Sequence, residues 1–335
     1  MKNILQKIYA SKTLTISETY KLFQSIINGK ISDIQLTAAL IAMKIRGESS
    51  EEILGAVQAC LEKTSAFPLL SYQYCDIVGT GGDSRNTINI STASACVAAV
   101  CGVKVAKHCN HSISSQTGSL DVLDCLGINI HASPEESKKN LDDFNICFLS
   151  APQYHTGFHN AAIVRKSLKT KTLFNIVGPL INPSQPSYIV VGVYNKCIIP
   201  VMIKTLYKLN YQRAIVVHSN DSDEITLCGK TYIAELKNKK IISYELESKD
   251  FGMNVHHRDA VKGGSAEENC DIIKKIFQGY GSIAQNETIA ANVAILLKIF
   301  GNENIKDNAK YALDIIHSGK TYTMLQALIN RNKHV

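Results

Sequence analysis

Residues 76–92 read DIVGTGGDSRNTINIST, and three glycines fall within the four positions 79–82. Glycine adopts positive φ without strain and lets another group approach the main chain closely, but it weakens helices and strands. The glycines follow CDIV at 75–78, an apolar run typical of a strand, and precede TASACVAAV at 92–100, which has a helical pattern. The stretch therefore predicts a strand, a binding loop and a helix.

This loop has the properties of an anion site without matching a standard nucleotide motif. A P-loop would need Gly-Lys-Ser/Thr after the glycines, and Ser84 occupies the last glycine position of G-x-G-x-x-G. Asn89, Ser91 and Thr92 stand where the next helix begins, and the N–H groups and dipole of a helix N-terminus favour phosphate. A tight turn before a well-capped helix is the alternative reading of the same residues.

A second loop repeats this logic at residues 107–127, KHCNHSISSQTGSLDVLDCLG. A strand ends at Lys107 and His108, polar residues follow, and Ser119 stands before another helical pattern. A lysine beside hydroxyl groups can hold a diphosphate, although these residues can also simply cap a sheet edge. Two such loops favour a polyphosphate ligand, because ligands collect at the carboxyl ends of parallel strands.

Further apolar runs indicate the rest of the sheet and its covering helices. Runs of this length suit strands that are buried on both faces of a largely parallel sheet. Residues 231–246 have the pattern of a hairpin, and 267–279 and 287–301 have the pattern of closing helices. The runs that we assign to strands lie at 75–78, 103–108, 145–149, 188–194 and 214–219.

The first 65 residues predict helices alone. Thr15 with Glu18, and Ser49 with Glu52, have capping-box spacing, and apolar residues recur behind them at steps of three and four. The expected fold is a small all-helical N-terminal domain, residues 1–70, and a larger α/β domain, residues 71–335, with a mostly parallel central sheet flanked by helices. Helices near 155–185 are expected to pack back onto the first domain.

Composition excludes several classes of protein. The 335 residues are 45% hydrophobic and 19% charged, as in an ordinary globular protein, and the net charge of +7 fits acidic small molecules as well as nucleic acid. The ten cysteines form no CxxC pair, which favours a reducing cytoplasm. We expect no signal peptide and no membrane span.

Three acids and one arginine extend the predicted site. Asp221, Asp223 and Glu224 follow a strand end, and carboxylates near phosphate loops are typical magnesium ligands, although a solvent-exposed acidic turn is the commoner case. Arg165 lies in a helical run, where it either faces solvent or binds a carboxylate.

His155 and His159 are four residues apart with Gly157 between them and no acid nearby, so we reject a zinc site.

Taken together, GTGGD, NIST, the Lys-His loop, FNIVGPLINP at 174–183, the Asp-Glu pair and KGGSAEEN at 262–269 resemble the anthranilate phosphoribosyltransferase family. The helical N-terminal region is similar as well, so the resemblance covers nearly the whole chain. It implies transfer of the 5-phosphoribosyl group from phosphoribosyl diphosphate to the amine of anthranilate in L-tryptophan biosynthesis. It also implies Mg²⁺, with two ions per active site, and a cytoplasmic homodimer formed through the helical domains, with no nucleic-acid or membrane partner.

The resemblance also assigns the site residues. It places Ser91, Asp223 and Glu224 on magnesium and Gly79, Asn110 and Arg165 on anthranilate. It assigns no residue to acid–base catalysis, since electrostatic stabilisation and positioning suffice. The residues that it places on phosphoribosyl diphosphate are Gly79, Gly82, Asp83, Thr87, Asn89, Ile90, Ser91, Thr92, Lys107, His108, Asn110, Ser112, Ser114, Ser115 and Ser119.

Two departures from the family pattern stand inside the site. Cys109 and His111 replace the glycine and arginine of Lys-His-Gly-Asn-Arg, and Asp221-Ser222 replaces Gly-Leu before the acid pair. We expect Cys109 to restrict positive φ in the loop and His111 to carry less positive charge than arginine. Both changes are expected to raise the KM for phosphoribosyl diphosphate.

Two other functions compete with this interpretation. A pyrimidine nucleoside phosphorylase shares the architecture and a similar Lys-His loop, but GTGGD with an Asp-Glu pair favours a diphosphate substrate. A noncatalytic paralogue that binds nucleic acid would be expected to lack the acids Asp223 and Glu224, which are present.

Overall fold

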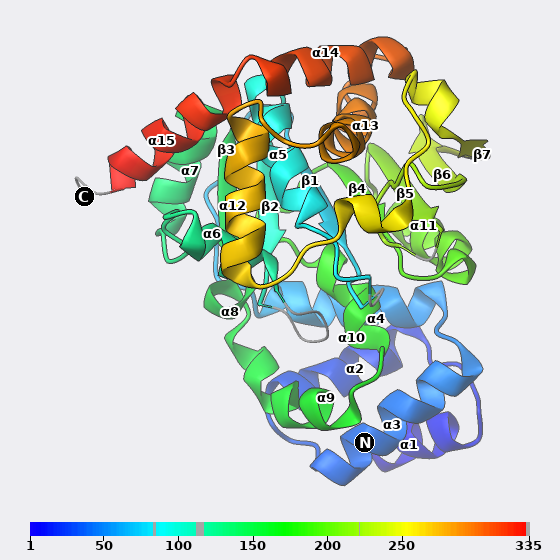
Figure 1. Ribbon diagram of the computed structural model, residues 1–335. Coiled ribbons are helices and arrows are strands. Elements are labelled where there is room, and N and C mark those ends of the chain that lie inside the picture. The colour runs from blue at the N-terminus through cyan, green and yellow to red at the C-terminus, as the bar shows by residue number, and fades with distance from the viewer. Residues whose placement is uncertain (83–84, 112–116, 221, 333–335) are drawn as a thin grey trace.

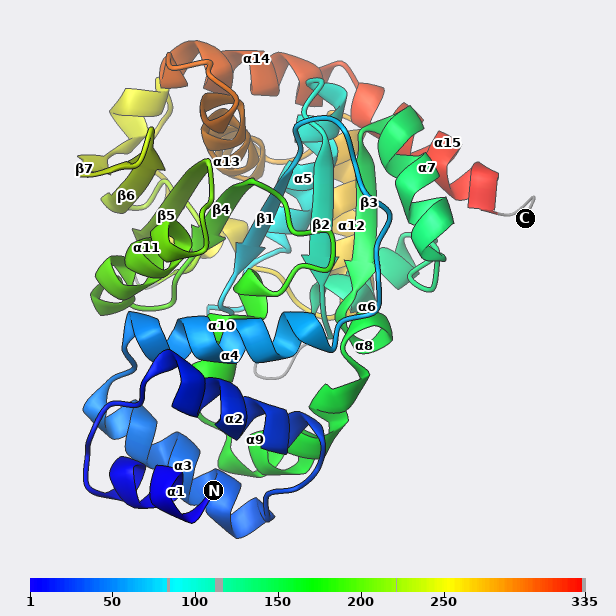
Figure 2. The same cartoon turned by 180° about the vertical axis from the view of Figure 1, so that it is seen from behind.

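The computed structural model describes residues 1–82, 85–111, 117–220 and 222–332. A sheet of seven strands runs through the larger part of the molecule, and the N-terminal helices gather beyond one end of it (Figures 1 and 2). In the described part of the chain, no helix has both the length and the apolar character needed to cross a bilayer.

The strands follow the order β3-β2-β1-β4-β5-β6-β7. The first five are parallel, and the last two form an antiparallel hairpin whose two-residue turn places Asn238 and Lys239 at φ 51° and 60°. The predicted parallel sheet and hairpin are confirmed. The strands are β1 (Cys75–Gly79), β2 (Val105–Cys109), β3 (Ile146–Ser150), β4 (Tyr188–Gly192), β5 (Arg213–Ser219), β6 (Thr231–Lys237) and β7 (Lys240–Leu246).

The N-terminal helices begin where the sequence places their caps. Thr15, Ser32 and Ser49 each accept a hydrogen bond from the N–H three residues on, and each capping box is complete. The third helix ends at Gly47, which has φ 88°. The helices are α1 (Lys2–Tyr9), α2 (Ile16–Ile27), α3 (Asp33–Arg46) and α4 (Ser50–Glu62).

Most of the remaining helices flank the sheet, while α9 lies beside α3, among the N-terminal helices (Figure 1). They are α5 (Ile90–Val100), α6 (Ser119–Cys125), α7 (Pro134–Phe144), α8 (Ala151–Tyr154), α9 (Ala162–Leu168), α10 (Leu173–Val177), α11 (Ile199–Lys208), α12 (Ala266–Phe277), α13 (Ile283–Ile299), α14 (Ile305–His317) and α15 (Lys320–Asn332). Short 3₁₀ turns span Thr156–Ala161, Gly178–Leu180, Lys196–Ile198, Ser248–Phe251 and Arg258–Val261.

Strands β4, β5 and β6 each contribute buried residues to two hydrophobic cores, one on each face of the sheet. In β4, Val190 packs into the core with α5, α12 and α13, whereas Ile189 and Val191 pack into the core with α11 and the N-terminal helices. Alternate residues of a strand point to opposite faces, so a sheet covered on both sides requires the continuous apolar runs seen in the sequence. This confirms the predicted fold class.

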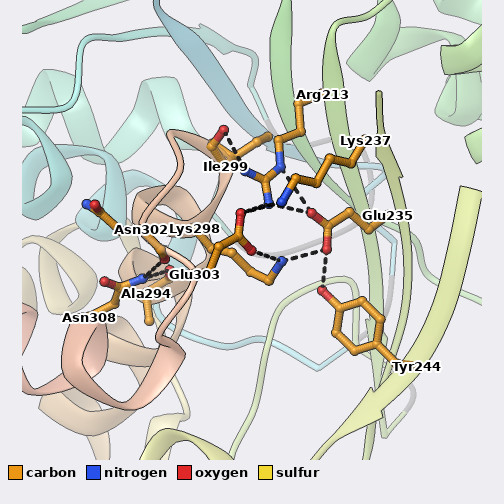
Figure 3. Close-up of polar contacts among 10 residues, drawn as sticks. All are labelled: Arg213, Glu235, Lys237, Tyr244, Ala294, Lys298, Ile299, Asn302, Glu303 and Asn308. Carbon is orange, nitrogen blue, oxygen red and sulfur yellow. Dashed lines mark hydrogen bonds and ion pairs between the residues drawn. The ribbon is translucent and has the colours of Figure 1, made fainter. Parts of the chain in front are cut away.

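A buried ionic network ties β5 and β6 to the end of α13 (Figure 3). Glu235 of β6 is fully buried and accepts hydrogen bonds from Arg213 at 2.6 Å, from Lys298 at 2.7 Å and from Tyr244 at 2.8 Å. Glu303 pairs with the same arginine and lysine at 2.9 and 3.0 Å. Two cations therefore share two carboxylates where the sheet edge meets the helix.

Protonation couples this network to stability. Burial opposes ionisation of Glu303, but hydrogen bonds from Lys237 and Lys298 and the charge of Arg213 outweigh it and bring its pKa to about 2. Burial likewise opposes ionisation of Glu235, yet its partners leave its pKa below the ordinary value. Because both pKa values are depressed by folding, the contribution is complete above about pH 4.3, the pKa of an unfolded glutamate. It is lost as the pH falls towards 2.

We expect Glu235→Gln to lower the free energy of unfolding by about 3–5 kcal/mol at pH 7, since removing one partner leaves buried charge unbalanced. Urea unfolding measures this difference, which should shrink as the pH falls below about 4.3, the pKa of an unfolded glutamate. Glu245→Gln, in the exposed pair with Lys230, is the control and should change stability by less than about 0.5 kcal/mol. Equal effects of both substitutions at pH 7 would contradict the role given to the network.

Candidate functional site

A cavity of about 260 Å³ opens at the carboxyl ends of the parallel strands. The loops that follow β1, β2 and β5 line one side of it, and Phe158, Arg165 and Phe174, from the segment that includes α9 and α10, line the other. Carboxyl ends of parallel strands are where α/β folds place their ligands. The two phosphate-type loops of the sequence thus meet at one site.

The glycine loop uses the freedom that its sequence provides. Gly81 and Gly82 have φ values of 66° and 76°, which side chains rarely tolerate. Thr80 anchors the start of the loop, because its N–H donates to the carbonyl of Gly192 and its hydroxyl accepts from the N–H of Tyr194. The expected bare backbone loop is therefore present.

Asp223 lies directly over the paired ends of two strands. Gly79 of β1 stands opposite Gly192 of β4. A Cβ on Gly79 would lie 2.3 Å from Asp223 Oδ2, and one on Gly192 would lie 1.5 Å from the carbonyl oxygen of Asp223. Oδ2 of Asp223 also accepts the N–H of Gly81 at 2.6 Å. Only glycine at both strand ends allows this carboxylate to reach the loop.

The second acid lies at the N-terminus of α5. Glu224 Oε1 accepts the N–H of Ser91 at 3.2 Å, and Ser222, a departure from the family pattern, accepts the N–H of Glu224 at 3.3 Å. Thr92 also lines the cavity, and its buried hydroxyl has no hydrogen-bond partner among the described residues. The helix N-terminus thus keeps polar groups available beside a carboxylate.

The donor atoms here fit magnesium. Asp223, Glu224 and Ser91 all line the cavity and offer only oxygen, the ligand type that Mg²⁺ prefers. Within the described residues, no three His, Cys, Asp or Glu side chains form a complete metal cage. Mg²⁺ commonly takes one or two carboxylates and completes its coordination with water and substrate phosphates.

Lys107 is a buried residue that lines the cavity. It is 2% exposed, and its Nζ donates to the carbonyl of Ile77 at 2.5 Å and to Ser91 Oγ at 3.2 Å. Burial raises the pKa of neighbouring Asp76 to about 6, although the charge of Lys107 opposes the rise. The ammonium group therefore holds Ser91 and places positive charge under the α5 N-terminus.

The second loop is organised by Ser119. Its Oγ accepts the N–H of Asn110 and donates to the carbonyl of Asn110, both at 3.1 Å. His111 Nδ1 lies 2.6 Å from Asp121 Oδ1. Cys109 is the last residue of β2, pairs with Ser150 and has no positive φ. The expectation that Cys109 restricts positive φ is therefore wrong, because extended strand backbone accommodates a Cβ.

Two buried histidines, His108 and His155, line the first and the neighbouring cavity, respectively. The rings of His108 and His155 meet edge to face with centroids 5.1 Å apart. Burial, followed by the proximity of His155, holds the pKa of His108 well below 6.5, and burial lowers the pKa of His155 to about 4. Both rings are therefore neutral at pH 7, and His108 cannot offer a charge to a phosphate.

Arg165 belongs to this cavity and to a neighbouring one of about 490 Å³. Its guanidinium lies over the ring of Phe174, 4.9 Å from the centroid, and burial lowers its pKa to about 10, so it stays charged at pH 7. Asn110 also lines both cavities. The arginine therefore faces the loops rather than bulk solvent.

The structure gathers most of the expected site residues. Ile90 is the exception: its side chain is buried in the core, one residue before Ser91. Asp83, Ser112, Ser114, Ser115 and Asp221 lie outside the described residues. The expected residues that line the cavity are Gly79, Gly82, Thr87, Asn89, Ser91, Thr92, Lys107, His108, Asn110, Ser119, Arg165, Asp223 and Glu224.

The sequence analysis missed residues that support the site through contacts with segments distant in sequence. Gly192 ends an apolar strand, and the glycine itself is the only sign in the sequence that another segment approaches the backbone there. Thr117 donates to the carbonyl of Gly264 at 2.8 Å, and Asn175 donates to the carbonyl of Thr80 at 3.3 Å. These residues lie far from their partners in sequence, so no local pattern could pair them.

Two family models match the chain in succession. Residues 2–64 match a helical bundle domain of the glycosyl transferase family, and residues 71–322 match its α/β domain. The chain is 55% identical to the anthranilate phosphoribosyltransferase of Buchnera aphidicola subsp. Acyrthosiphon pisum over 99% of its length and 97% of that relative. It is 51% identical to the enzyme of the same name from Erwinia tasmaniensis, covering 99% and 100% of the two chains.

Solved structures that resemble this chain along nearly its whole length have the same name as these relatives. Anthranilate phosphoribosyltransferase from Thermus thermophilus has a TM-score of 0.91 at 30% identity, with 98% of both chains covered. The Saccharomyces cerevisiae enzyme, solved in complex with phosphoribosyl diphosphate and Mg, has a TM-score of 0.89 at 26% identity, with 99% of this chain and 98% of that one covered.

Proposed function

This chain belongs to the anthranilate phosphoribosyltransferase family, and we propose that its cavity joins the 5-phosphoribosyl group of phosphoribosyl diphosphate to the amine of anthranilate. The products are N-(5-phosphoribosyl)anthranilate and diphosphate, and the reaction serves L-tryptophan biosynthesis. One observation carries the assignment most directly: the glycine loop, the α5 N-terminus and two carboxylates converge on a single cavity opposite Arg165.

The phosphate side of the cavity takes phosphoribosyl diphosphate. The glycine-loop backbone, the α5 N-terminus and Ser119 supply hydrogen bonds, and Lys107 supplies buried positive charge. Asp83, Ser112, Ser114 and Ser115, outside the described residues, are assigned here through the family resemblance. Asp223 and Glu224, with Ser91, hold Mg²⁺, with two ions per site. Magnesium held there would supply positive charge against the leaving diphosphate.

Transfer requires the amine nitrogen to bond to the anomeric carbon while the bond from that carbon to the diphosphate oxygen breaks. The bonding electrons leave with diphosphate, and the amine gives up a proton. An aryl amine is already neutral at pH 7, so the chain needs no strong general base. Its residues stabilise the departing charge through N–H groups and Lys107 and hold the two reactants in line.

Anthranilate enters through the second cavity, which meets the first at Asn110 and Arg165. A guanidinium that is partly removed from water forms a strong, directional pair with a carboxylate. The rings of Phe158 and Phe174, which meet edge to face with centroids 5.6 Å apart, add aromatic surface to the cavity. This arrangement orients the amine towards the phosphate loops.

The chain forms a homodimer through its helical region and works in the cytoplasm. Ile34 and Ile45 on α3 are 83% and 81% exposed, and Ile163 on adjoining α9 is 70% exposed. Large apolar side chains that are exposed along one helix and its neighbour are common at protein contacts. All ten cysteines are free thiols, which supports a reducing compartment that cell fractionation would identify.

Wild-type protein should lower the fluorescence of an anthranilate solution only when phosphoribosyl diphosphate and Mg²⁺ are both present. Asp223→Asn with Glu224→Gln should lower turnover by more than about 100-fold, because the amides keep an acceptor for Gly81 and Ser91 but lose the charge. Calorimetric titration of magnesium with the substrate gives the number of ions. A control, Asp271→Asn with Asp314→Asn, removes two exposed charges and should stay active. Full activity of the site variant would refute the metal assignment.

Arg165→Ala should raise the KM for anthranilate about tenfold or more, since a charged hydrogen bond contributes roughly 1.5–3 kcal/mol. The KM for phosphoribosyl diphosphate should change by less than about twofold and serves as the internal control. Steady-state kinetics with each substrate varied in turn measures both values. A parallel rise in both would show that Arg165 only supports the cavity wall.

Ile34→Glu with Ile45→Glu should convert the dimer to monomer, because buried charges without partners oppose association. Sedimentation equilibrium measures the mass. Leu69→Glu is the control, since Leu69 is 97% exposed but lies outside α3. A dimer that survives the double substitution would place the interface elsewhere.

A further inference from the structure

We propose that Asn269 of α12 is a positioning residue that fixes the hydrogen-bond polarity of Asn89 and joins the two phosphate loops. The inference rests on the proposed function, because Asn89 is assigned to phosphoribosyl diphosphate there. Asn269 is 1% exposed and does not line the cavity. It ends the KGGSAEEN stretch, 180 residues beyond Asn89.

Two hydrogen bonds engage both ends of its amide. The Oδ1 atom of Asn269 accepts the backbone N–H of Gly264 at 2.8 Å. Its Nδ2 atom donates to Oδ1 of Asn89 at 2.9 Å. Asn89 stands immediately before α5 and lines the cavity.

The backbone donor settles the orientation of both amides. A main-chain N–H can only donate, so Asn269 must present its oxygen to Gly264. Its NH₂ group must then face Asn89, which must present oxygen in return. The NH₂ group of Asn89 remains to donate to an anion in the cavity. The relay thus turns Asn89 into a donor towards phosphate, a choice that an isolated asparagine would leave open.

The same segment also reaches both loops. The N–H of Gly263 donates to the carbonyl of Asn86 at 2.7 Å, and Thr87 bridges to Lys262. The carbonyl of Gly264 accepts the hydroxyl of Thr117, which precedes α6 and lines the cavity. The stretch that Asn269 orders therefore lies between the first loop and the end of the second.

At Gly263 and Gly264, the space that a side chain would need is already occupied by neighbouring atoms. A Cβ on Gly263 would lie 2.4 Å from Asn269 Oδ1 and 2.8 Å from the backbone of Thr87 and Ile88. A Cβ on Gly264 would lie 1.8 Å from Glu268 Oε2. Glycine at both positions lets the segment pass between the first loop and α12.

Two substitutions of Asn269 change the hydrogen bonds of Asn89 in different ways. In Asn269→Asp the carboxylate still accepts from Gly264 but cannot donate, so Asn89 must turn its NH₂ group inwards and its oxygen to the ligand. The buried carboxylate lowers stability somewhat, although Gly264 and Asn89 still supply hydrogen-bond donors to it. In Asn269→Ala the relay is lost without added charge. Lys275→Gln, at an exposed position of the same helix, lowers the net charge by one and leaves the relay intact.

We expect Asn269→Asp and Asn269→Ala to raise the KM and the Kd for phosphoribosyl diphosphate about tenfold. The KM for anthranilate and kcat should change by less than about twofold in both variants, even where the Tm is lowered. Lys275→Gln should behave as wild type. Steady-state kinetics, calorimetric titration of the diphosphate substrate and thermal unfolding supply these values.

Unchanged binding of phosphoribosyl diphosphate by the Asp variant would overturn the relay, as would equal changes in both KM values that follow a lowered Tm. A wild-type protein that neither binds this substrate nor consumes anthranilate would instead refute the proposed function, and the relay with it. An active wild type with unaffected Asn269 variants would refute the relay alone.

Discussion

The approach of Asp223 to the paired ends of β1 and β4 is the constraint on which the site depends. Gly79 and Gly192 stand side by side in the sheet, and a Cβ on either would meet atoms of Asp223 well inside van der Waals contact. Because both positions lack a side chain, the segment after β5 can cross the sheet edge and bring its carboxylate to the glycine loop. The register of two parallel strands thus decides where the acid lies.

The two acids each perform a structural task at the site. Asp223 accepts the N–H of Gly81, and Glu224 accepts the N–H of Ser91. These bonds hold the loop and the α5 N-terminus in a shape that can receive an anion, while Lys107 balances the negative charge from below. Binding of a magnesium diphosphate would exchange some of these contacts rather than build the loops anew. Preorganisation of this kind lowers the cost of ordering groups around a ligand.

The helical region contributes to the site through packing. One hydrophobic core contains residues of α1–α4, of α11 and of one face of β4, β5 and β6. Val164 and Phe174 belong to the same core and flank Arg165. The arginine is therefore held at the cavity by apolar neighbours whose core continues into the sheet. A change in how the helices pack on the sheet would alter the distance between the two cavities.

The sequence determined the elements and the chemical character of the loops. Apolar runs, capping boxes and the glycines at 79–82 are local signals, because helix caps and positive φ depend on neighbouring residues alone. Tertiary structure decided the rest. It buried Lys107 and His108, placed Cys109 in a strand where its Cβ costs nothing, and directed Ile90 into the core. It also brought Asn269 to Asn89 and Gly192 beneath Asp223. These outcomes depend on strand register and helix packing between segments distant in sequence, which no local pattern encodes.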